Sequence, residues 1–527
     1  MRRRHVLTVS AVAATAALAL SACGTTGGDG EGDYVSGGTF VKALTGDPGN
    51  LNPFNAISFD TIELMTANYE ALVYVDAEGE HFPWLAESWE VSGTEVSFTL
   101  KDGITCVDGS EFTAETAANN INYNADPENA TLIHGTQVTA DMTATAEGNV
   151  MTVTSTVNDP FLLTNVGTVL QVCQAVLDDV TAADDTLIGT GLFAPDVFEA
   201  GSSYTFTKRD DYTWGPFDVT SDTPGLPDTL EYRIVNDEST RANLLLSGEI
   251  NAAGVIGPDA ARLDAAGLEY QGVRNSVGEM LFNERADRPT SDPLVREALV
   301  TALDREEVGA VIADGKGIEA ISLVTKPPLI CVEEKPLWTL VDHDLDRAAE
   351  LLDEAGWTVG ADGNRVNAEG EPLVIKFIYD APTATHGPAA ELVAEIWSEL
   401  GIQTELSAND AAAWSEQLFS TFDWDTGWVQ IGPNSPVQNA IFYDAAGPDE
   451  GGLNFMFVEN PEYEALAAEA RVASPEEACD LWNQAEAELI DRFDVFPLID
   501  NIIPMYGTGA DFDAPNYILP TSIRMLG

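Results

Sequence analysis

The stretch EVSFTLKDGITCVDGSEFTA, residues 95–114, decides the fold class because it places a strand, a turn and a helix start in close succession. Polar and apolar side chains alternate from Glu95 to Leu100, and this alternation predicts a strand with one buried face. Asp108-Gly109 predicts a turn, and Thr113 can cap a helix that we expect to run to about Asn124. The stretch therefore predicts a strand followed by a helix.

Similar units follow along the chain. Asp292-Pro293 supplies a cap and a first-turn proline for an amphipathic helix, and residues 373–379 form a β-rich run. Residues 389–400 carry an apolar stripe with helical spacing, and residues 402–406 alternate as a strand. Residues 474–477 (SPEE) form a capping box with proline at the first helical position. This alternation indicates an α/β protein whose sheets are covered by helices.

Length and charge limit the class of protein. With 527 residues, of which 45% are hydrophobic, the chain is long enough for two or more domains with full cores. It has 24 Lys and Arg against 87 Asp and Glu, which gives a formal net charge of −63. Nucleic-acid binding requires cationic side chains that displace counterions from phosphates. We therefore expect no nucleic-acid partner, and an acidic, well-solvated surface.

The first 23 residues have the three parts of a secretory signal. Arg2, Arg3 and Arg4 precede an apolar run from Val6 to Leu20, which is shorter than the roughly 20 residues that cross a bilayer. Leu20-Ser21-Ala22-Cys23 resembles a bacterial lipobox, and this resemblance implies cleavage before Cys23 and lipid attachment to it. An ordinary secretory signal with a spare thiol at Cys23 is the alternative. Residues 24–38 are rich in Gly, Thr, Asp and Ser and predict a flexible tether.

Four further cysteines are Cys106, Cys173, Cys331 and Cys479. Outside the cytoplasm, four cysteines predict two disulfides, for which three pairings are possible. We favour Cys106–Cys173 with Cys331–Cys479, because this pairing alone keeps each bridge within one half of the chain. No C-x-x-C occurs, so a redox or zinc site is not expected.

The sequence offers little support for an enzyme. It contains neither H-E-x-x-H nor G-x-S-x-G, the patterns of zinc peptidases and serine hydrolases. We therefore assign no catalytic residue and expect no metal and no cofactor. A secreted acidic hydrolase is the alternative from another class, because a pair of carboxylates among so many cannot be recognised from sequence.

Aromatic side chains between Trp414 and Tyr443 are interleaved with glycine, proline and amides, a composition that suits a small-molecule cleft. The alternative is that these aromatic side chains pack a core. We predict Trp428 as a wall of the cleft and Gln430 and Asn434 as polar ligand contacts. Trp424 and Tyr443 are predicted as further aromatic contacts.

Seven stretches carry motifs that occur in a fixed order. They are LAESWE (85–90), FTLKDGI (98–104), DGSEFTA (108–114), GTGLF (189–193), SGEIN (247–251), VREAL (295–299) and AAELLDEAGW (348–357). This ordered set resembles the extracytoplasmic solute-binding proteins of ABC importers, the peptide-binding family called family 5. Glu111 and Leu192 stand where the family usually has proline. The likeness runs from about Gly37 to about Pro497.

The resemblance implies a two-lobe periplasmic-binding-protein type II fold with an extra inserted domain, as in the large peptide binders. Ligand would be buried between lobes that close by hinge motion. The expected divisions are a signal peptide (1–22), a tether (23–38), lobe I (39–66, 185–272 and 494–527), an inserted domain II (67–184) and a lobe III (273–493).

The resemblance also implies a function. The protein is expected to be a monomer, lipid-anchored on the extracytoplasmic face of the cell membrane, that passes oligopeptides to an ABC permease. Peptide-binding relatives often have acids after their Gly-Trp, whereas this chain has Ile431 and Asn434 there. A buried peptide amine needs a compensating charge, which Asp423 or Asp425 could supply. Oligosaccharides and metal chelates are the alternative ligands.

Overall fold

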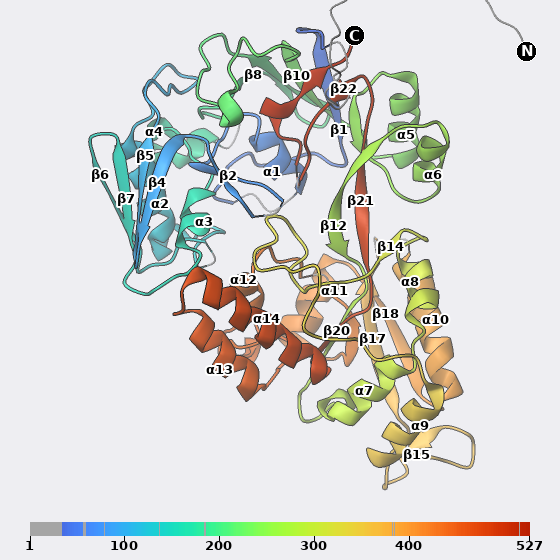
Figure 1. The fold of residues 1–527 in the computed structure, drawn as a ribbon. Helices are drawn as coiled ribbons and strands as arrows, with labels where there is room; N and C mark the ends of the chain where they lie inside the picture. Colours follow the sequence, from blue (N-terminus) through green and yellow to red (C-terminus); the bar gives the residue numbers. More distant parts are fainter. Residues whose placement is uncertain are drawn as a thin grey trace, which may run out of the picture.

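The computed structural model contains three main sheets arranged in two lobes, one above the other in Figure 1. Residues 1–33 fall outside the described part of the chain, and with them the predicted signal peptide, Cys23 and most of the predicted tether. The described residues are 34–55, 59–77, 79–135, 137–183, 186–381, 383, 385–429, 431–515 and 517–527.

The upper lobe is built on a sheet in the order β12-β21-β11-β1-β10-β9-β8, with β14 pairing β21. Its strands come from widely separated parts of the chain, and β1 pairs β10 in parallel. Helices α5 (Glu238–Ser247) and α6 (Gly257–Ala265) pack on β1, β11 and β21 through a separate apolar cluster. The strands are β1 (Thr39–Leu44), β8 (Phe193–Glu199), β9 (Ser203–Lys208), β10 (Thr229–Ile234), β11 (Ala252–Gly254), β12 (Tyr270–Ser276), β14 (Gly317–Ile318) and β21 (Asp500–Gly507).

A four-stranded antiparallel sheet beside the upper lobe contains the stretch that opened the sequence analysis. Its order is β4 (Ala86–Ser92), β5 (Glu95–Leu100), β7 (Val150–Thr154) and β6 (Thr143–Glu147). Helix α2 (Ala114–Ala125) begins after Thr113, whose side chain accepts a hydrogen bond from Thr116 N. The strand, the cap and the helix predicted from sequence are therefore confirmed.

The lower lobe is built on a five-stranded sheet in the order β18-β17-β19-β13-β20. Two of its main helices begin at caps predicted from the sequence, Asp292 before α7 and Ser474 with Glu477 before α14. Its strands are β13 (Glu279–Phe282), β17 (Val374–Asp380), β18 (Gln403–Asn409), β19 (Thr426–Trp428) and β20 (Val495–Pro497), and its main helices are α7 (Pro293–Thr301), α8 (Arg305–Ile312), α9 (Leu345–Glu354), α10 (His386–Glu399), α13 (Pro461–Ala470) and α14 (Pro475–Asp491).

Each lobe has its own apolar core. One cluster joins the upper lobe to the four-stranded domain, and a second fills the lower lobe. Disulfides link Cys106 to Cys173 in the first and Cys331 to Cys479 in the second, the pairing favoured from sequence. Buried Arg296 contacts Glu284 at 3.1 Å and Asp494 at 2.9 Å, so its charge is compensated inside the lower core.

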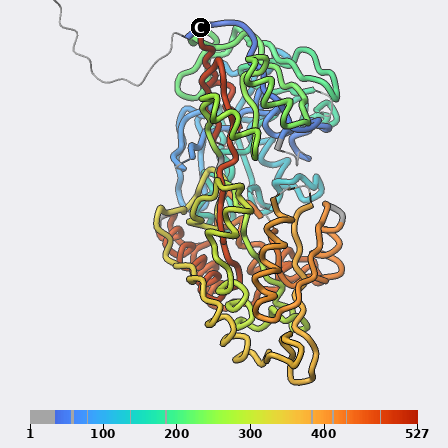
Figure 2. Tube along the Cα trace, turned by 90° about the vertical axis from the view of Figure 1, so that its right-hand side faces the viewer, coloured from blue at the N-terminus to red at the C-terminus, as the bar shows by residue number. Residues whose placement is uncertain are grey.

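The two lobes are joined by a ribbon of two antiparallel strands. β12 and β21 pair from Tyr270 opposite Tyr506 to Ser276 opposite Asp500, and Figure 2 shows them running side by side toward the lower lobe. Below the ribbon, Gly278 N donates to Ile499 O and Leu498 N donates to Gly278 O, both at 3.1 Å. At these two short links the chain passes from the sheet of the upper lobe to the sheet of the lower lobe. The domain limits expected from the sequence stay a prediction.

Candidate functional site: a cavity between the lobes

A cavity of about 460 Å³ lies where the two lobes face each other, and its lining includes residues of the β2 strand (Val73–Val75) and of helix α12 (Pro436–Ala440), both labelled in Figure 1. This volume is within the range of roughly 300–1,000 Å³ that is typical of small-molecule sites. Its lining comes from segments of the upper lobe, the four-stranded domain and the lower lobe. A ligand in this cavity would therefore contact both lobes at once.

The upper wall is mainly apolar. Helix α1 (Phe59–Met65) presents Ile62 and Met65, and the β2 strand (Val73–Val75) adds all three of its residues. Phe54 also lines the cavity and packs against Tyr123 at a ring-centroid distance of 4.5 Å. The rest of this wall includes Trp84, Leu132, Ile133, Tyr517, Ile518 and Leu519.

The lower wall consists of Pro327, Pro328, Asn434 and Gln438. Pro327-Pro328 contains a cis peptide bond, and the backbone amides of Thr325 and Lys326 both donate to Pro433 O at 3.2 Å. Helix α12 (Pro436–Ala440) follows at once, with the Ser435 hydroxyl accepting from Gln438 N. The proline pair and the two amides therefore belong to one hydrogen-bonded unit.

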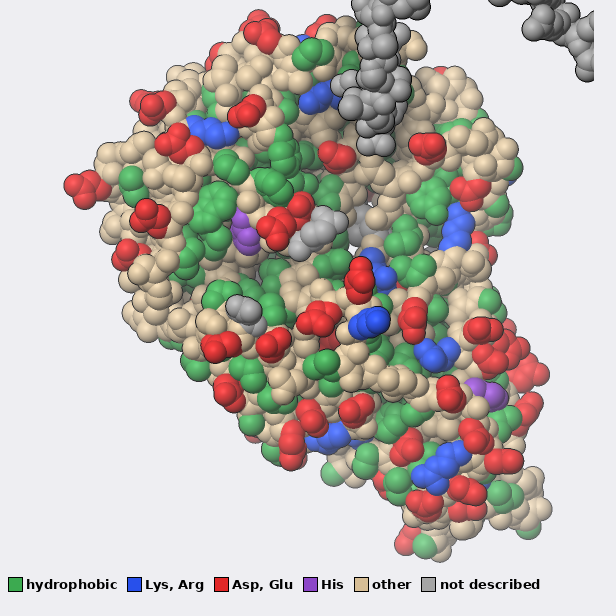
Figure 3. Space-filling view, in the orientation of Figure 1, with side chains coloured by type: hydrophobic (Ala, Val, Ile, Leu, Met, Phe, Trp, Pro, Cys, Tyr) green, Lys and Arg blue, Asp and Glu red, His purple; other side chains and the backbone are tan. Residues whose placement is uncertain are grey.

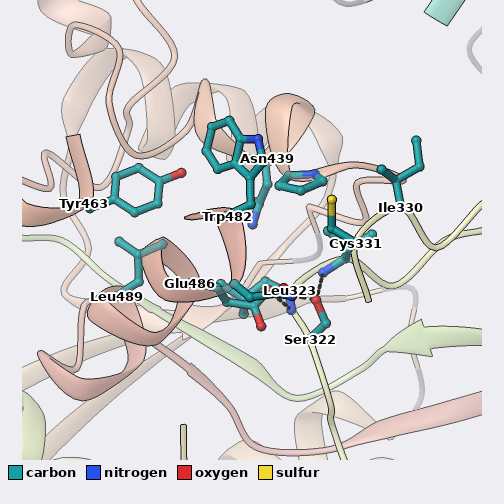
Figure 4. Close-up of a pocket in the computed structure, with 12 residues that line it drawn as sticks. Ser322, Leu323, Ile330, Cys331, Asn439, Tyr463, Trp482, Glu486 and Leu489 are labelled. Carbon is teal, nitrogen blue, oxygen red and sulfur yellow. Dashed lines mark hydrogen bonds between the residues drawn. The ribbon is translucent and has the colours of Figure 1, made fainter. Parts of the chain in front are cut away.

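The loop that carries Pro327-Pro328 is attached to helix α14 on both sides of the proline pair, as Figure 4 shows in part. The Glu486 carboxylate accepts from Ser322 Oγ at 2.8 Å, from Leu323 N at 2.9 Å and from Trp338 Nε1 at 2.9 Å. Cys331 in the same loop is bonded to Cys479 on α14. Burial raises the pKa of Glu486, and the three hydrogen bonds oppose that rise.

The sequence-predicted site residues occupy different places. Asn434 lines the cavity, and Gln430 lies outside the described residues. Trp424, Trp428 and Tyr443 have exposed side-chain fractions of 0%, 1% and 0% and belong to the lower core. The structure brings none of these three into the described lining, so ligand contact by them stays a prediction.

Trp428 nevertheless lies in the lower core on a strand that leads toward the cavity wall. Its ring packs edge-on against Phe377 at 4.9 Å and lies 5.7 Å from the His386 ring. Gly427 before it must lack a side chain, because a Cβ there would overlap the Ile378 carbonyl of the neighbouring strand. The strand held in this way leads within six residues to Asn434.

Most of the lining could not be identified from the sequence. The wall residues Phe54, Tyr74, Trp84, Pro328 and Leu519 come from four distant segments, of which only the hairpin that carries Tyr74 and Trp84 is local in sequence. Besides the aromatic segment that predicted Asn434, the proline pair is a recognisable signal, because consecutive prolines mark a loop with restricted conformation. The cavity therefore forms only when the folded chain brings these segments together.

The four-stranded domain also contacts the lower lobe beside the cavity. Asn158 Nδ2 donates to Ala473 O at 3.2 Å, and the Phe161 side chain is buried in the lower apolar cluster. Asp159 accepts from Phe161 N at 2.8 Å, and burial raises the pKa of Asp159. These contacts bridge the two lobes independently of the β12–β21 ribbon.

The described part of the chain has no group of three or more His, Cys, Asp or Glu side chains placed to hold a metal ion. Among the helices described, none combines the length and the apolar character that a bilayer span requires. Figure 3 shows Asp and Glu spread over one face and outnumbering Lys and Arg there.

Comparison with known proteins identifies the family. A model described as bacterial extracellular solute-binding proteins, family 5 Middle, matches residues 80–452. The oligopeptide-binding protein OppA of Bacillus subtilis (strain 168) is 24% identical over 517 residues, with 91% of both chains covered.

Two solved structures share the fold. NikA from Brucella suis, in complex with Fe(III)-EDTA, has a TM-score of 0.78 and 22% identity over 93% of this chain and 100% of that one. AppA from Bacillus subtilis, in complex with a nonapeptide, has a TM-score of 0.72 and 19% identity over 94% of this chain and 100% of that one. Because the family model spans well over half of the chain, this protein belongs to family 5 of the bacterial extracellular solute-binding proteins, which are transport components of ABC importers.

Proposed function

We propose that this protein is the lipid-anchored substrate-binding component of an ABC importer, and that it captures oligopeptides between its lobes and delivers them to a membrane permease. The observation that carries the proposal is the cavity of about 460 Å³ lined from both lobes. A ligand that contacts both lobes favours their closed arrangement, because it binds that arrangement more tightly than an open one. A permease can then distinguish loaded from empty protein by shape.

The oligopeptide class is supported by the OppA and AppA similarities, since those proteins are described as binding oligopeptides. NikA is described with a metal chelate, and a chelate or an oligosaccharide is the alternative outcome of the experiment below. Among the sequence-predicted residues, Asn434 has the most direct support as a ligand contact because it lines the cavity.

We propose lipid attachment at Cys23 and residence on the extracytoplasmic face from the sequence of residues 2–23. Membrane fractionation of the host tests this proposal. The natural chain should sediment with membranes, whereas Cys23→Ala should appear in the released fraction. Equal release of both forms would contradict lipid anchoring.

Native mass spectrometry tests the binding function. The Cys23→Ala protein would be purified gently from its own host, and bound molecules would be identified by fragmentation. A series of peptide masses is the expected result. A sugar or chelate mass would keep the importer role and change the substrate, whereas sustained hydrolysis of an added peptide or glycan would favour an enzyme. No bound ligand, with no rise in melting temperature on adding peptides or oligosaccharides, would contradict the binding function.

A further inference from the structure

The cavity lining lacks ionisable acids and bases. None of the 25 described lining residues is Asp, Glu, Lys, Arg or His. At the 21% charged content of the whole chain, about five charged residues would be expected among them. The undescribed residues nearest the lining segments in sequence, at 56–58, 136 and 516, are also uncharged residue types, and Glu78, three residues after Val75, is the charged exception. In a protein with a formal net charge of −63, the wall of the cavity is therefore unusually neutral.

Buried charges next to the lining in sequence already have partners. Glu63 pairs with Lys42 at 3.1 Å, and both side chains are almost fully buried. Glu70 accepts hydrogen bonds from Thr190, Tyr212 and Trp214. Neither carboxylate is available to a ligand without breaking these contacts.

Lys326 adjoins Pro327, but its side chain lies beside Gly432, where an added Cβ would come within 2.8 Å of Nζ. Burial lowers the pKa of Lys326, so its site is poorly suited to hold a charge. The cavity wall thus offers neither an acid for a ligand amine nor a base for a ligand carboxylate.

Four of the polar side chains that line the cavity are carboxamides, which donate and accept hydrogen bonds without charge, and the others are hydroxyls and one indole. Asn124 and Gln137 come from the four-stranded domain, and Asn434 and Gln438 come from the lower wall. The Asn124 side chain is 1% exposed, and its Oδ1 has no hydrogen-bond partner within the described structure. A buried acceptor without a partner costs about 1–3 kcal/mol, and a ligand donor would remove that cost where the wall moves to expose this oxygen.

We infer that the cavity selects a solute without ionised groups, mainly apolar and bearing amides, such as a short peptide whose termini are blocked or joined in a ring. The inference rests on the proposed function and specifies its substrate. An ammonium or carboxylate that leaves water for a wall without a counter-charge loses several kcal/mol of solvation. A peptide amide has one donor and one acceptor, which match the carboxamides on the two walls.

A peptide series tests the inference by isothermal titration calorimetry on the Cys23→Ala protein. The probes are Leu-Phe-Leu with free termini, its N-acetyl form, its C-terminal amide and the form blocked at both ends. We expect the doubly blocked peptide to bind at least tenfold more tightly than the zwitterion, with the singly blocked forms between them. Equal or tighter binding of the zwitterion would overturn the inference while leaving the importer function intact.

Substitutions in the protein test the same inference from the side of the cavity wall. Asn434→Asp adds a carboxylate to the wall and should shift the preference at least tenfold toward the C-terminal amide, which has a free amine. The matched control Gln484→Glu makes the same charge change on an exposed part of α14 and should shift nothing. Lys326→Gln should leave binding of the N-acetyl peptide, which has a free C-terminal carboxylate, unchanged, and a clear loss would show that a ligand anion reaches Lys326 and overturn the inference.

If no peptide of the series binds, the charge of the molecule found by native mass spectrometry decides whether the inference holds. An uncharged bound molecule supports the inference, and an ionised one overturns it but keeps the proposed function. The absence of any bound molecule in both experiments overturns the inference and the proposed function together.

Discussion

At the scale of single residues, substitution of Trp428 distinguishes a packing role of this side chain from direct ligand contact. Trp428→Ala should lower the free energy of unfolding by about 3–5 kcal/mol, because it leaves a cavity between Phe377 and His386 in the lower core. Urea denaturation measures the loss, and Trp428→Phe should lose less. Trp357→Ala, at a partly exposed position of the same lobe, is the control. Weaker ligand binding at unchanged stability would contradict the packing role and favour direct contact.

Glu279 should make the free energy of unfolding depend on pH. Burial, with repulsion from Asp500 and Glu486, raises the pKa of Glu279 from 4.5 to about 8. A carboxyl with a raised folded-state pKa binds more protons when folded, so its contribution to stability is present below about pH 4.5 and is lost as the pH rises to about 8. The free energy of unfolding should therefore fall between these values by up to about 1.4 kcal/mol per pH unit.

Glu279→Gln should flatten that slope, because the amide does not titrate. Urea denaturation of both proteins at pH 5, 6.5 and 8 makes the comparison. The same slope in the two proteins would show that Glu279 is not the group that titrates.

At the scale of elements, helix α14 fixes the loop of the lower cavity wall. Replacing Cys331 and Cys479 by serine should destabilise the protein by about 2–5 kcal/mol, because the unfolded chain gains freedom. It should also weaken ligand binding about tenfold, since Pro327-Pro328 lies in the loop that the bond restrains.

The second disulfide supplies the control. Replacing Cys106 and Cys173 should cost similar stability but change ligand affinity less, because the lining residues 168–170 near Cys173 are also held by the hydrogen bond from Gln171 N to Glu70 O at 2.8 Å. Calorimetric binding and melting temperatures distinguish the two double variants. Equal losses of affinity in both would mean that general destabilisation, and not the wall loop, controls binding.

Elements with local signals were predictable from the sequence, and the site largely was not. Thr113, Asp292 and Ser474 mark helix starts because capping depends on neighbouring residues alone. The aromatic segment predicted one wall residue, Asn434, but sequence composition could not distinguish a buried Trp424 from an exposed one. The upper wall depends on packing between α1, β2 and the chain near Leu519, which only the folded structure brings together.

At the scale of the whole molecule, the bridge formed by Asn158 and Phe161 influences how the lobes close. Phe161→Ala removes apolar packing across the lobes, so the closed arrangement should lose stability relative to an open one. We expect a larger radius of gyration by small-angle X-ray scattering and about tenfold weaker ligand binding. Val157→Ala, at an exposed neighbouring position, is the control. An unchanged radius and affinity would show that the bridge has no part in closure.

The position of β21 in the upper sheet also bears on biosynthesis. β21 lies between β12 and β11, yet it is made more than 220 residues after β12. The strands of the lower lobe all fall between residues 279 and 497, so the sheet of that lobe can form without β21. A chain halted before residue 500 would expose the free edges of β11 and β12, and such edges template aggregation. The molecule thus becomes competent for its task only after its C-terminal segment has joined the upper sheet, and interrupted products would expose edges that proteases and chaperones can recognise.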